Sequence, residues 1–553
     1  MNANGARSAR DGGMKRRDFL GAAALPWALA GCSPAAPITG GFVGASFERG
    51  HLLKAKSGNL PSPTHTFRCR VLIVGGGVAG LAAARALRLR GVDDVALLEL
   101  EDTAGGNSRG GSVNGIACPL GAHYLPVPGD HARDVQHLLE DLGVRQRVAG
   151  RWTYDERTLC HSPQERLFVG DSATGEWHDG LLPQPGTDGV DASALADYQR
   201  FAELVQQAAK PGIFTIPVSN SSPARDLLAW DAMTFEAWLN QQQLHSPALR
   251  WYLDYCCRDD YGAGIAGVSA WAGLHYFASR HGFSAPGGEA AAEKEAGVLT
   301  WPQGNGWLTQ QLAAPLGQRL HTGRVVLRVD AGKHRVVVDA LNVATQQVER
   351  WQADHCITCL PLFVAARVVH NPPPALRPAA SSLRYAPWLV ANLHLRAALH
   401  DRPGAAPSWD NVIYSPGQPT AHGQSLGYVD ARHQSLDRVP GATVLTHYRA
   451  FGIGPVQRQA LYDQPWSHWR DALLAELAVP HPDLPGKVSH IDVMRYGHAM
   501  SVPVPGTRAN AALRALQQPA GRLQFAHSDL SGYSVFEEAF AQGYRAGMAV
   551  VSG

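Results

Sequence analysis

One stretch of the chain combines strand and helix patterns in a regular order. Residues 70–74 form a continuous apolar run, which is typical of a strand buried on both faces. A glycine-rich turn at 75–80 follows, and the alanine-rich segment 81–90 predicts a helix. A second apolar run occupies 95–99. The pattern predicts a strand, a helix and a parallel strand, the opening unit of a Rossmann-type domain.

The rest of the chain changes its pattern twice. Helical periodicity dominates between about 146 and 300, and strand patterns dominate afterwards. The sequence therefore predicts an α/β protein, with a Rossmann-type domain interleaved with an α+β domain of antiparallel sheet plus helices. The expected elements are helices at 191–210, 235–242 and 248–279, short strands at 325–329, 335–339 and 355–360, longer antiparallel strands at 387–396, 442–450 and 488–495, and a closing strand, loop and helix at 523–553.

Segment 1–32 has the pattern of an export signal. Arg16-Arg17 precede Phe-Leu and a weakly apolar run that is too short for a membrane span. A twin arginine in this context predicts a Tat-type signal, so we expect the Tat export machinery to carry the folded protein to the periplasm. The run ending at Cys32 resembles a lipobox, which leaves two alternatives, a lipid anchor on Cys32 or plain cleavage. Residues 33–66 are rich in Pro, Gly and Ser and are expected to form a linker.

Composition narrows the class of protein. The 553 residues are 45% hydrophobic and 17% charged, which indicates a globular protein with large cores. The formal net charge of +2 predicts no nucleic-acid partner. The eight cysteines are too scattered for a disulfide framework, and the histidines do not fall at zinc-ligand spacings, so no metal site is expected.

The glycine-rich turn predicts a dinucleotide site. Gly75 permits the tight turn, Gly77 lets a pyrophosphate approach the backbone, and Gly80 lets the helix pack close to the strand. The helix N-terminus then offers unsatisfied N–H groups and a favourable dipole to the phosphates. Glu99 ends the second strand, where its carboxylate is expected to bind the ribose of the adenosine.

Two further segments carry a family resemblance. Leu98-Glu99, a short spacer and Gly105-Gly106 resemble the flavin amine oxidase and protoporphyrinogen oxidase superfamily, as does the closing run from Phe525 to Gly532. The resemblance implies FAD as the cofactor. It also implies that Gly105 and Gly106 run along the FAD, that the backbone of Val326 contacts adenine, and that Asp529 contacts the region between pyrophosphate and ribityl chain.

The same resemblance implies a domain division. Residues 67–145, 301–370 and 491–553 are expected to build the FAD-binding domain. Residues 146–300 and 371–490 are expected to build the substrate domain, which covers the reactive face of the flavin.

The chain departs from the family pattern at three places. Arg109 follows Gly-Gly after two intervening residues instead of directly, and it is counted among the residues expected to bind the cofactor. The strand 387–393 has no lysine where many members carry one facing flavin N5, which favours an electron acceptor other than oxygen. The paired aromatic residues of an amine cage are not evident near 495–500.

Two residues are catalytic candidates, His275 and Trp388. Trp271 and His275 lie four apart on one helix face, so they predict either a cavity wall or core packing. The sequence predicts an FAD-dependent oxidoreductase that oxidises or desaturates an organic small molecule by hydride transfer to flavin N5 in the cell envelope. The alternatives are an amine oxidase acting on a primary amine or polyamine, and a non-catalytic FAD-binding envelope protein.

Overall fold

The computed structural model describes most of the chain after the signal segment. The predicted Tat motif at Arg16-Arg17 and the lipobox cysteine Cys32 lie outside the described residues. No helix within the described part is long and apolar enough to cross a membrane. The described residues are 37–55, 62–186, 190–210, 212–224, 227–280, 282–286, 297–415, 424–435, 439–519 and 521–552.

The predicted Rossmann unit is present and forms the centre of one sheet, which we call the nucleotide sheet. Strand β2 (His65–Val74) pairs in parallel with β3 (Val95–Leu98) on one side and with β15 (Gln347–Thr358) on the other. Helix α3 (Val78–Leu89) connects β2 to β3. The other strands of this sheet are β12 (Leu320–His321), β13 (Arg324–Ala331), β14 (Val336–Asn342), β16 (Val369–His370) and β22 (Leu523–Phe525).

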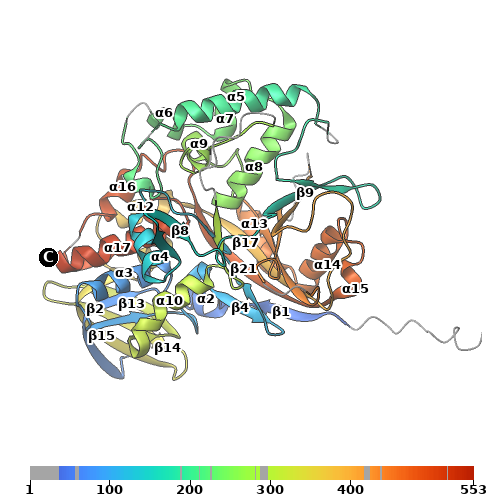
Figure 1. Ribbon diagram of the computed structural model, residues 1–553. Helices are drawn as coiled ribbons and strands as arrows, with labels where there is room; N and C mark the ends of the chain where they lie inside the picture. Colours follow the sequence, from blue (N-terminus) through green and yellow to red (C-terminus); the bar gives the residue numbers. More distant parts are fainter. Residues whose placement is uncertain are drawn as a thin grey trace, which may run out of the picture.

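The C-terminal helix α17 (Phe536–Ser552) packs against α3, so the last helix of the chain completes the domain that β2 and α3 begin (Figure 1). The contact is close because two glycines of α17 face α3. A Cβ added at Gly543 would lie 2.0 Å from the carbonyl oxygen of Ala79, and one added at Gly547 would lie 2.8 Å from that of Ala83. Any side chain at Gly543 would therefore push the helices apart.

A second sheet, which we call the substrate sheet, is built mostly from the predicted long strands. Its centre is β17 (Arg384–Leu395), which pairs antiparallel with both β20 (Thr443–Ala450) and β21 (Val488–Val502). Because β21 continues to Val502, the expected domain boundary at 490 falls inside a strand. The remaining strands are β1 (Thr39–Val43), β9 (Glu165–Val169), β10 (Glu176–Asp179), β18 (Asp410–Ile413) and β19 (Gln424–Asp430).

Helices cover one end of the substrate sheet (Figure 1). The prediction of one helix over 248–279 is wrong. Helix α8 (Pro247–Tyr261) ends at Gly262, which has a left-handed φ of +76°, and α9 (Ala270–Ala278) begins after the capping hydroxyl of Ser269. Apolar periodicity continued across the break and hid this stop signal. The other helices of this layer are α5 (Ser193–Ala208), α6 (Leu228–Asp231) and α7 (Phe235–Gln241).

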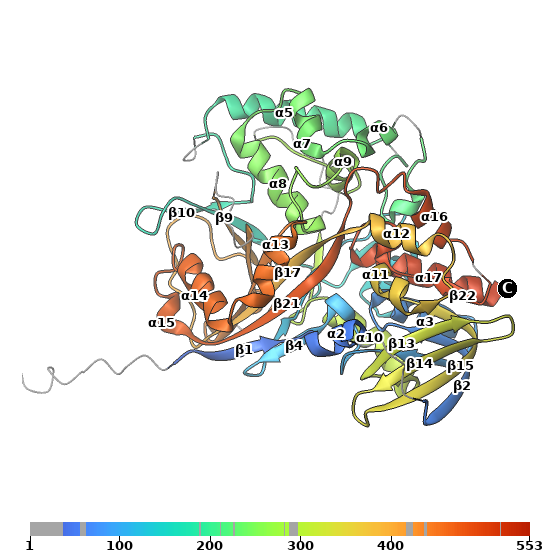
Figure 2. The ribbon, with the colours of Figure 1, turned by 180° about the vertical axis from the view of Figure 1, so that it is seen from behind.

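The expected linker 33–66 contains folded elements. Its described part holds β1, helix α2 (Phe47–Ala55) and the first residues of β2. In this segment Gly40 and Gly41 lie within β1, and the hydroxyl of Ser46 caps α2. Figure 2 shows α2 beside the nucleotide sheet and β1 along the edge of the substrate sheet.

Smaller elements complete the fold around these sheets. The smaller elements near the site are β4 (Gly110–Val113), β5 (Ile116–Pro119), β6 (Tyr124–Pro126), α10 (Gly306–Ala313), α11 (Leu362–Val368), α13 (Pro455–Asp463) and the short helix η5 (Ser528–Leu530).

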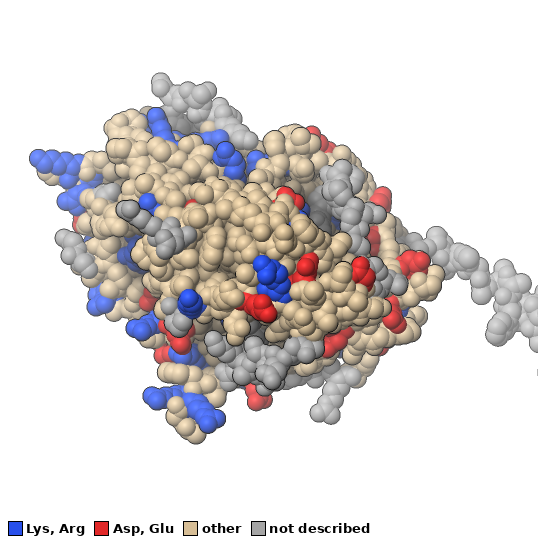
Figure 3. All heavy atoms as spheres, turned by 90° about the horizontal axis from the view of Figure 1, so that it is seen from above, with Lys and Arg blue, Asp and Glu red and all other residues tan. Residues whose placement is uncertain are grey.

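Seen from above, basic side chains lie mainly on the left of the molecule and acidic ones mainly on the right (Figure 3).

Candidate active site

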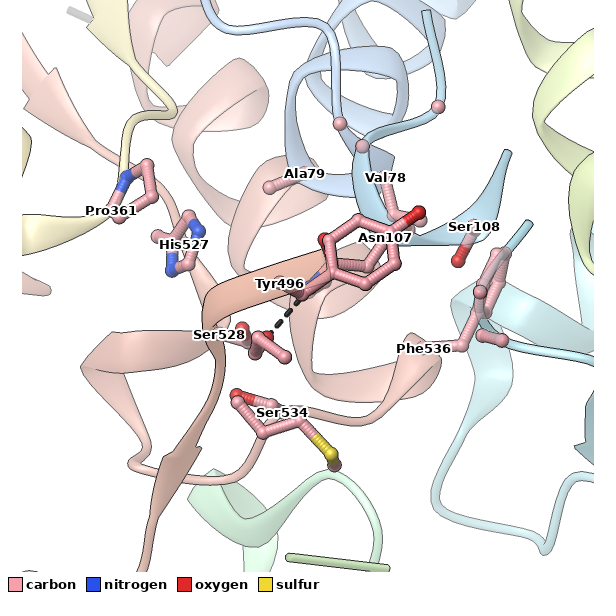
Figure 4. Close-up of a pocket in the computed structure, with 18 of the residues that line it drawn as sticks. Val78, Ala79, Asn107, Ser108, Pro361, Tyr496, His527, Ser528, Ser534 and Phe536 are labelled. Atoms are coloured by element: carbon pink, nitrogen blue, oxygen red, sulfur yellow. Dashed lines mark hydrogen bonds between the residues drawn. The ribbon is translucent and has the colours of Figure 1, made fainter. Parts of the chain in front are cut away.

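A cavity of about 440 Å³ lies where the two sheets meet. Its walls come from segments that are far apart in sequence, including the start of α3, strand β21 and the segment just before α17 (Figure 4). Of the predicted cofactor residues, all but Gly80 and Arg109 line it, namely Gly75, Gly77, Glu99, Gly105, Gly106, Val326 and Asp529. The predicted dinucleotide residues are therefore brought together.

The glycines of the first turn do what the sequence predicts. Gly75 has a left-handed φ of +104°. A Cβ at Gly80 would lie 1.9 Å from the carbonyl oxygen of Gly75, so only glycine lets α3 approach β2. Gly77 differs, because a Cβ there would meet only the Cα of Gly106, at 4.0 Å. Space on that side of Gly77 thus belongs to the cavity and is available to a ligand.

The Gly-Gly loop lies directly against this turn. The N–H of Gly105 donates to the carbonyl of Gly76 over 2.8 Å, and both Gly105 and Gly106 have positive φ. Arg109 lies behind the loop: its Nε donates to the carbonyl of Gly106 over 3.1 Å, and a Cβ at Gly105 would meet its side chain. Arg109 does not line the cavity, so it supports the loop rather than forming the cavity wall.

The Glu99 carboxylate closes the nucleotide end of the cavity. It accepts backbone hydrogen bonds from Gly76 over 2.7 Å and from Glu101 over 2.8 Å. Burial raises the pKa of Glu99 above its ordinary value, and the two N–H donors partly offset this rise. The two bonds fix the carboxylate beside Val326, which lies on the same cavity wall.

Asp529 is fully buried in the short helix η5, which follows β22 at the same carboxyl edge of the nucleotide sheet as Glu99. Its Oδ2 accepts from the Tyr385 hydroxyl over 2.6 Å and from the N–H of Leu362 over 2.8 Å. Burial opposes ionisation, but nearby His527 and these donors lower the pKa of Asp529 below its ordinary value. Its Oδ1 lies 3.2 Å from Nδ1 of His527, which also lines the cavity. His527 and Asp529 therefore form a polar part of the cavity wall.

These features fit FAD. The open face of Gly77, the N-terminus of α3 and the ribose-binding position of Glu99 suit an adenosine diphosphate. The polar pair of His527 and Asp529 suits the hydroxyl-bearing ribityl chain. The residues at this end of the cavity therefore fit a flavin dinucleotide.

Aromatic side chains from three adjacent strands line the rest of the cavity. Trp388 and Tyr496 are direct cross-strand partners, and so are Val390 and Tyr448. Because partners and alternate residues share one face of a sheet, all four point to the cavity side. The Tyr448 hydroxyl donates to the Gly121 carbonyl over 2.9 Å, and that of Tyr496 donates to the Leu120 carbonyl over 2.7 Å. Neither tyrosine was predicted to line the cavity, because only the strand register reveals which residues face it.

Carboxylates from the last turn of α8 also reach the cavity. Asp260 forms an ion pair of 2.8 Å with Arg280, whereas Asp259 accepts a hydrogen bond of 3.0 Å from the neutral phenol of Tyr124. Burial and the neighbouring Asp260 raise the pKa of Asp259 to about 6. The nearby His123 is kept neutral, since burial lowers its pKa to about 3. Asp259 was not predicted, because an expected helix over 248–279 does not place this residue in a last turn.

Of the two catalytic candidates, only Trp388 lines the cavity. His275 is sealed in the helical layer, where its Nε2 contacts the carbonyl of Thr215 at 2.9 Å and its ring stacks on Trp271 with centroids 5.0 Å apart. Neither His275 nor Trp271 lines the cavity. The hypothesis that Trp271 and His275 form a substrate wall is wrong, because that helix face packs against Phe214 and Tyr533 instead.

Comparisons with known proteins agree with this geometry. The model of the family described as flavin containing amine oxidoreductase matches residues 78–551. A putative flavin-containing monoamine oxidase of Mycobacterium tuberculosis is 26% identical over 67% of this chain and 75% of its own. Mitochondrial protoporphyrinogen oxidase of Nicotiana tabacum is 36% identical over 18% of this chain, and the match spans only 19% of that relative.

Solved structures share the fold. Cyclohexylamine oxidase from Brevibacterium oxydans has a TM-score of 0.60 at 17% identity, with 88% of this chain and 99% of that chain covered. Wild-type putrescine oxidase bound to putrescine has a TM-score of 0.62 at 18% identity, with 88% and 100% covered.

The fold and the site define an FAD-dependent oxidoreductase. The chain belongs to the flavin-containing amine oxidoreductase family. The predicted family, the predicted fold class and the predicted FAD cofactor are therefore confirmed.

Proposed function

We propose that this protein oxidises an organic amine whose ammonium group is held by Asp259. The observation that carries the proposal is the position of this carboxylate in the same cavity as the cofactor residues. Arg280 is already paired with Asp260, and the donor to Asp259 is an uncharged phenol. A cation is the ligand that best satisfies a carboxylate in such surroundings.

Helix α8 strengthens the preference for a cation. The C-terminal end of a helix carries a partial negative charge, so carboxylates in its last turn are unfavourable by themselves. Asp259 and Asp260 both occupy the last turn of α8. Both carboxylates interact unfavourably with the helix dipole, and the pKa of Asp259 is raised. Perturbations of this kind are typical of functional sites.

The residues of this chain would position the substrate and exclude water. When bound, FAD supplies a flavin ring whose N5 accepts a hydride from a substrate C–H bond. Trp388, Tyr448 and Tyr496 form a stiff apolar wall that would orient the carbon to be oxidised. Asp259 would hold the cationic end, with Tyr124 fixing the carboxylate. The same carboxylate would take the ammonium proton before the hydride leaves, because only the neutral amine gives an iminium product. Among relatives, the named putrescine, cyclohexylamine and monoamine oxidases support an amine.

The electron acceptor and the location are part of the proposal. No lysine lies among the described residues that line the cavity, and Trp388 and Val390 occupy the wall of β17. We therefore favour an acceptor other than oxygen. The twin arginine Arg16-Arg17 supports export of the folded, FAD-loaded protein to the periplasm. Replacing both arginines by lysine should leave the precursor in the cytoplasm.

An anaerobic screen tests the proposed reaction. The purified flavoprotein is mixed with primary amines and polyamines, and in parallel with neutral cyclic compounds, while the flavin absorbance is followed. Bleaching by amines supports the proposal. Bleaching by neutral compounds alone would favour oxidation or desaturation of another substrate class. Absence of bleaching by the whole panel would favour a non-catalytic FAD-binding protein.

A further inference from the structure

The segment 39–53, which we call the N-terminal arm, connects the two sheets. Its strand β1 pairs in parallel with β21 from Thr39 opposite His490 to Val43 opposite Met494. Gly40 is required there, since a Cβ would lie 1.8 Å from the carbonyl oxygen of Ile491. Farther on, the ring of Phe47 packs on Tyr462 of α13 with centroids 4.7 Å apart. The first half of the arm is therefore fixed to the substrate sheet and its helix.

The second half of the arm is fixed to the loop that follows β3. The Ser46 hydroxyl caps α2 by accepting from the N–H of Arg49 over 3.3 Å. The N–H of Ser46 donates to the Glu101 carboxylate over 2.8 Å. Arg49 binds the Leu100 carbonyl over 3.2 Å and the Asp102 carboxylate over 2.8 Å. These bonds orient α2 across the loop next to Glu99.

The last turn of α2 then reaches the cavity itself. Leu52 and Leu53 both pack against the apolar cluster around Val325 and Leu341 on the nucleotide sheet. Only Leu53 also lines the cavity, together with Glu99 and Val326. In a Rossmann unit the acid at the end of the second strand marks the adenosine end of the dinucleotide. Leu53 is thus an apolar wall residue at the adenosine end.

We propose that the N-terminal arm is part of the FAD site and retains the cofactor by covering its adenosine end with Leu53. The family match begins at residue 78, so the arm lies outside the matched region. An adenine ring offers a flat apolar face that a leucine side chain would keep from water. Since α2 is held to both sheets, FAD leaves only after these contacts open. The inference rests on the FAD cofactor and not on the identity of the substrate.

Release of FAD from the purified flavoprotein tests this role. The Leu53→Ala variant and the wild type are diluted into flavin-free buffer, and free flavin is followed by fluorescence. FAD release should accelerate on the order of tenfold in Leu53→Ala, because the apolar contact with adenine is lost. Leu53→Met, which keeps the apolar volume, should release FAD at nearly the wild-type rate.

Leu52→Ala is the matched control, since Leu52 packs on the same cluster without lining the cavity. It should release FAD at close to the wild-type rate. A second readout uses FMN, which lacks the adenosine: deflavinated Leu53→Ala should bind FMN as tightly as the wild type does. The proposal would be overturned if Leu52→Ala and Leu53→Ala accelerated FAD release equally. It would also be overturned if Leu53→Ala lost as much affinity for FMN as for FAD. Either result would leave amine oxidation untouched.

Discussion

Tyr124 and Asp259 form a hydrogen bond of 3.0 Å, in which the phenol donates to the carboxylate at the cavity wall. Burial and Asp260 favour the protonated carboxyl, whereas the phenol and Arg280 favour the ionised form. The balance places the pKa of Asp259 at about 6, so this group changes charge just below neutral pH. The chemistry proposed for the cavity depends on that charge.

Binding of a cation should therefore strengthen as the pH rises through about 6. Above this pKa Asp259 is ionised and attracts an ammonium group, and below it the neutral carboxyl does not. tert-Butylammonium is a suitable probe, because its nitrogen-bearing carbon has no hydrogen to transfer. Its Kd, measured from perturbation of the flavin spectrum, should fall between pH 5 and pH 7. A Kd that is constant over this range would count against Asp259 as the cation ligand; tert-butanol serves as the neutral control.

Gly77→Val should abolish FAD binding without unfolding the protein. A Cβ at Gly77 meets only Gly106 Cα at 4.0 Å, so the valine side chain occupies cofactor space rather than core. The flavin-to-protein absorbance ratio should fall to near zero, while far-ultraviolet circular dichroism stays as in the wild type. Gly80→Val is the contrasting variant, because its side chain would collide with the Gly75 carbonyl and should disrupt folding.

The two catalytic candidates should now behave differently. Trp388→Phe should retain FAD and lower kcat/KM on the order of tenfold, since the aromatic wall changes shape. His275→Ala should instead lower the free energy of unfolding by about 2–4 kcal/mol, through a core cavity and the loss of the contact with Thr215. Its kcat/KM per folded molecule should stay within about twofold of the wild type. A clearly lower kcat/KM in a His275→Ala protein that remains folded would contradict a purely structural role for this residue.

Asp529→Asn should weaken FAD binding more than Tyr385→Phe does. Both variants disturb the same buried bond, but Asp529→Asn also removes the negative charge and the ion pair with His527 at the cavity wall. The comparison is made by thermal unfolding with and without added FAD. Stabilisation by FAD should be smaller in Asp529→Asn, whereas Tyr385→Phe should lose about 1 kcal/mol of stability and keep its response to FAD.

The cofactor half of the site was predictable from sequence because it depends on local geometry. Gly75, Gly77 and Gly80 are close together in the chain, and a strand, a helix and an acid at fixed spacing define their roles. Arg109 shows the limit of this reasoning. It follows the Gly-Gly loop in sequence, yet its side chain turns behind the loop.

The substrate half was not predictable in the same way. Tyr448 and Tyr496 face the cavity because β20 and β21 pair with β17 in one particular register, which no local pattern encodes. Asp259 was hidden by an apolar periodicity that runs past the stop at Gly262. The folding of the arm depends on partners more than 400 positions away, such as Thr39 on His490.

The most direct test of the account is anaerobic reduction of the flavin by putrescine and by cyclohexylamine in the wild type and in Asp259→Asn. The substitution keeps the shape of the side chain and removes its charge. We expect amines to bleach the wild-type flavin, and we expect the amine concentration for half-maximal reduction to rise on the order of 30-fold or more in Asp259→Asn. FAD content should stay unchanged. Equal half-maximal concentrations in the two proteins, or bleaching of the wild type by neutral cyclic compounds alone, would contradict the proposed amine site.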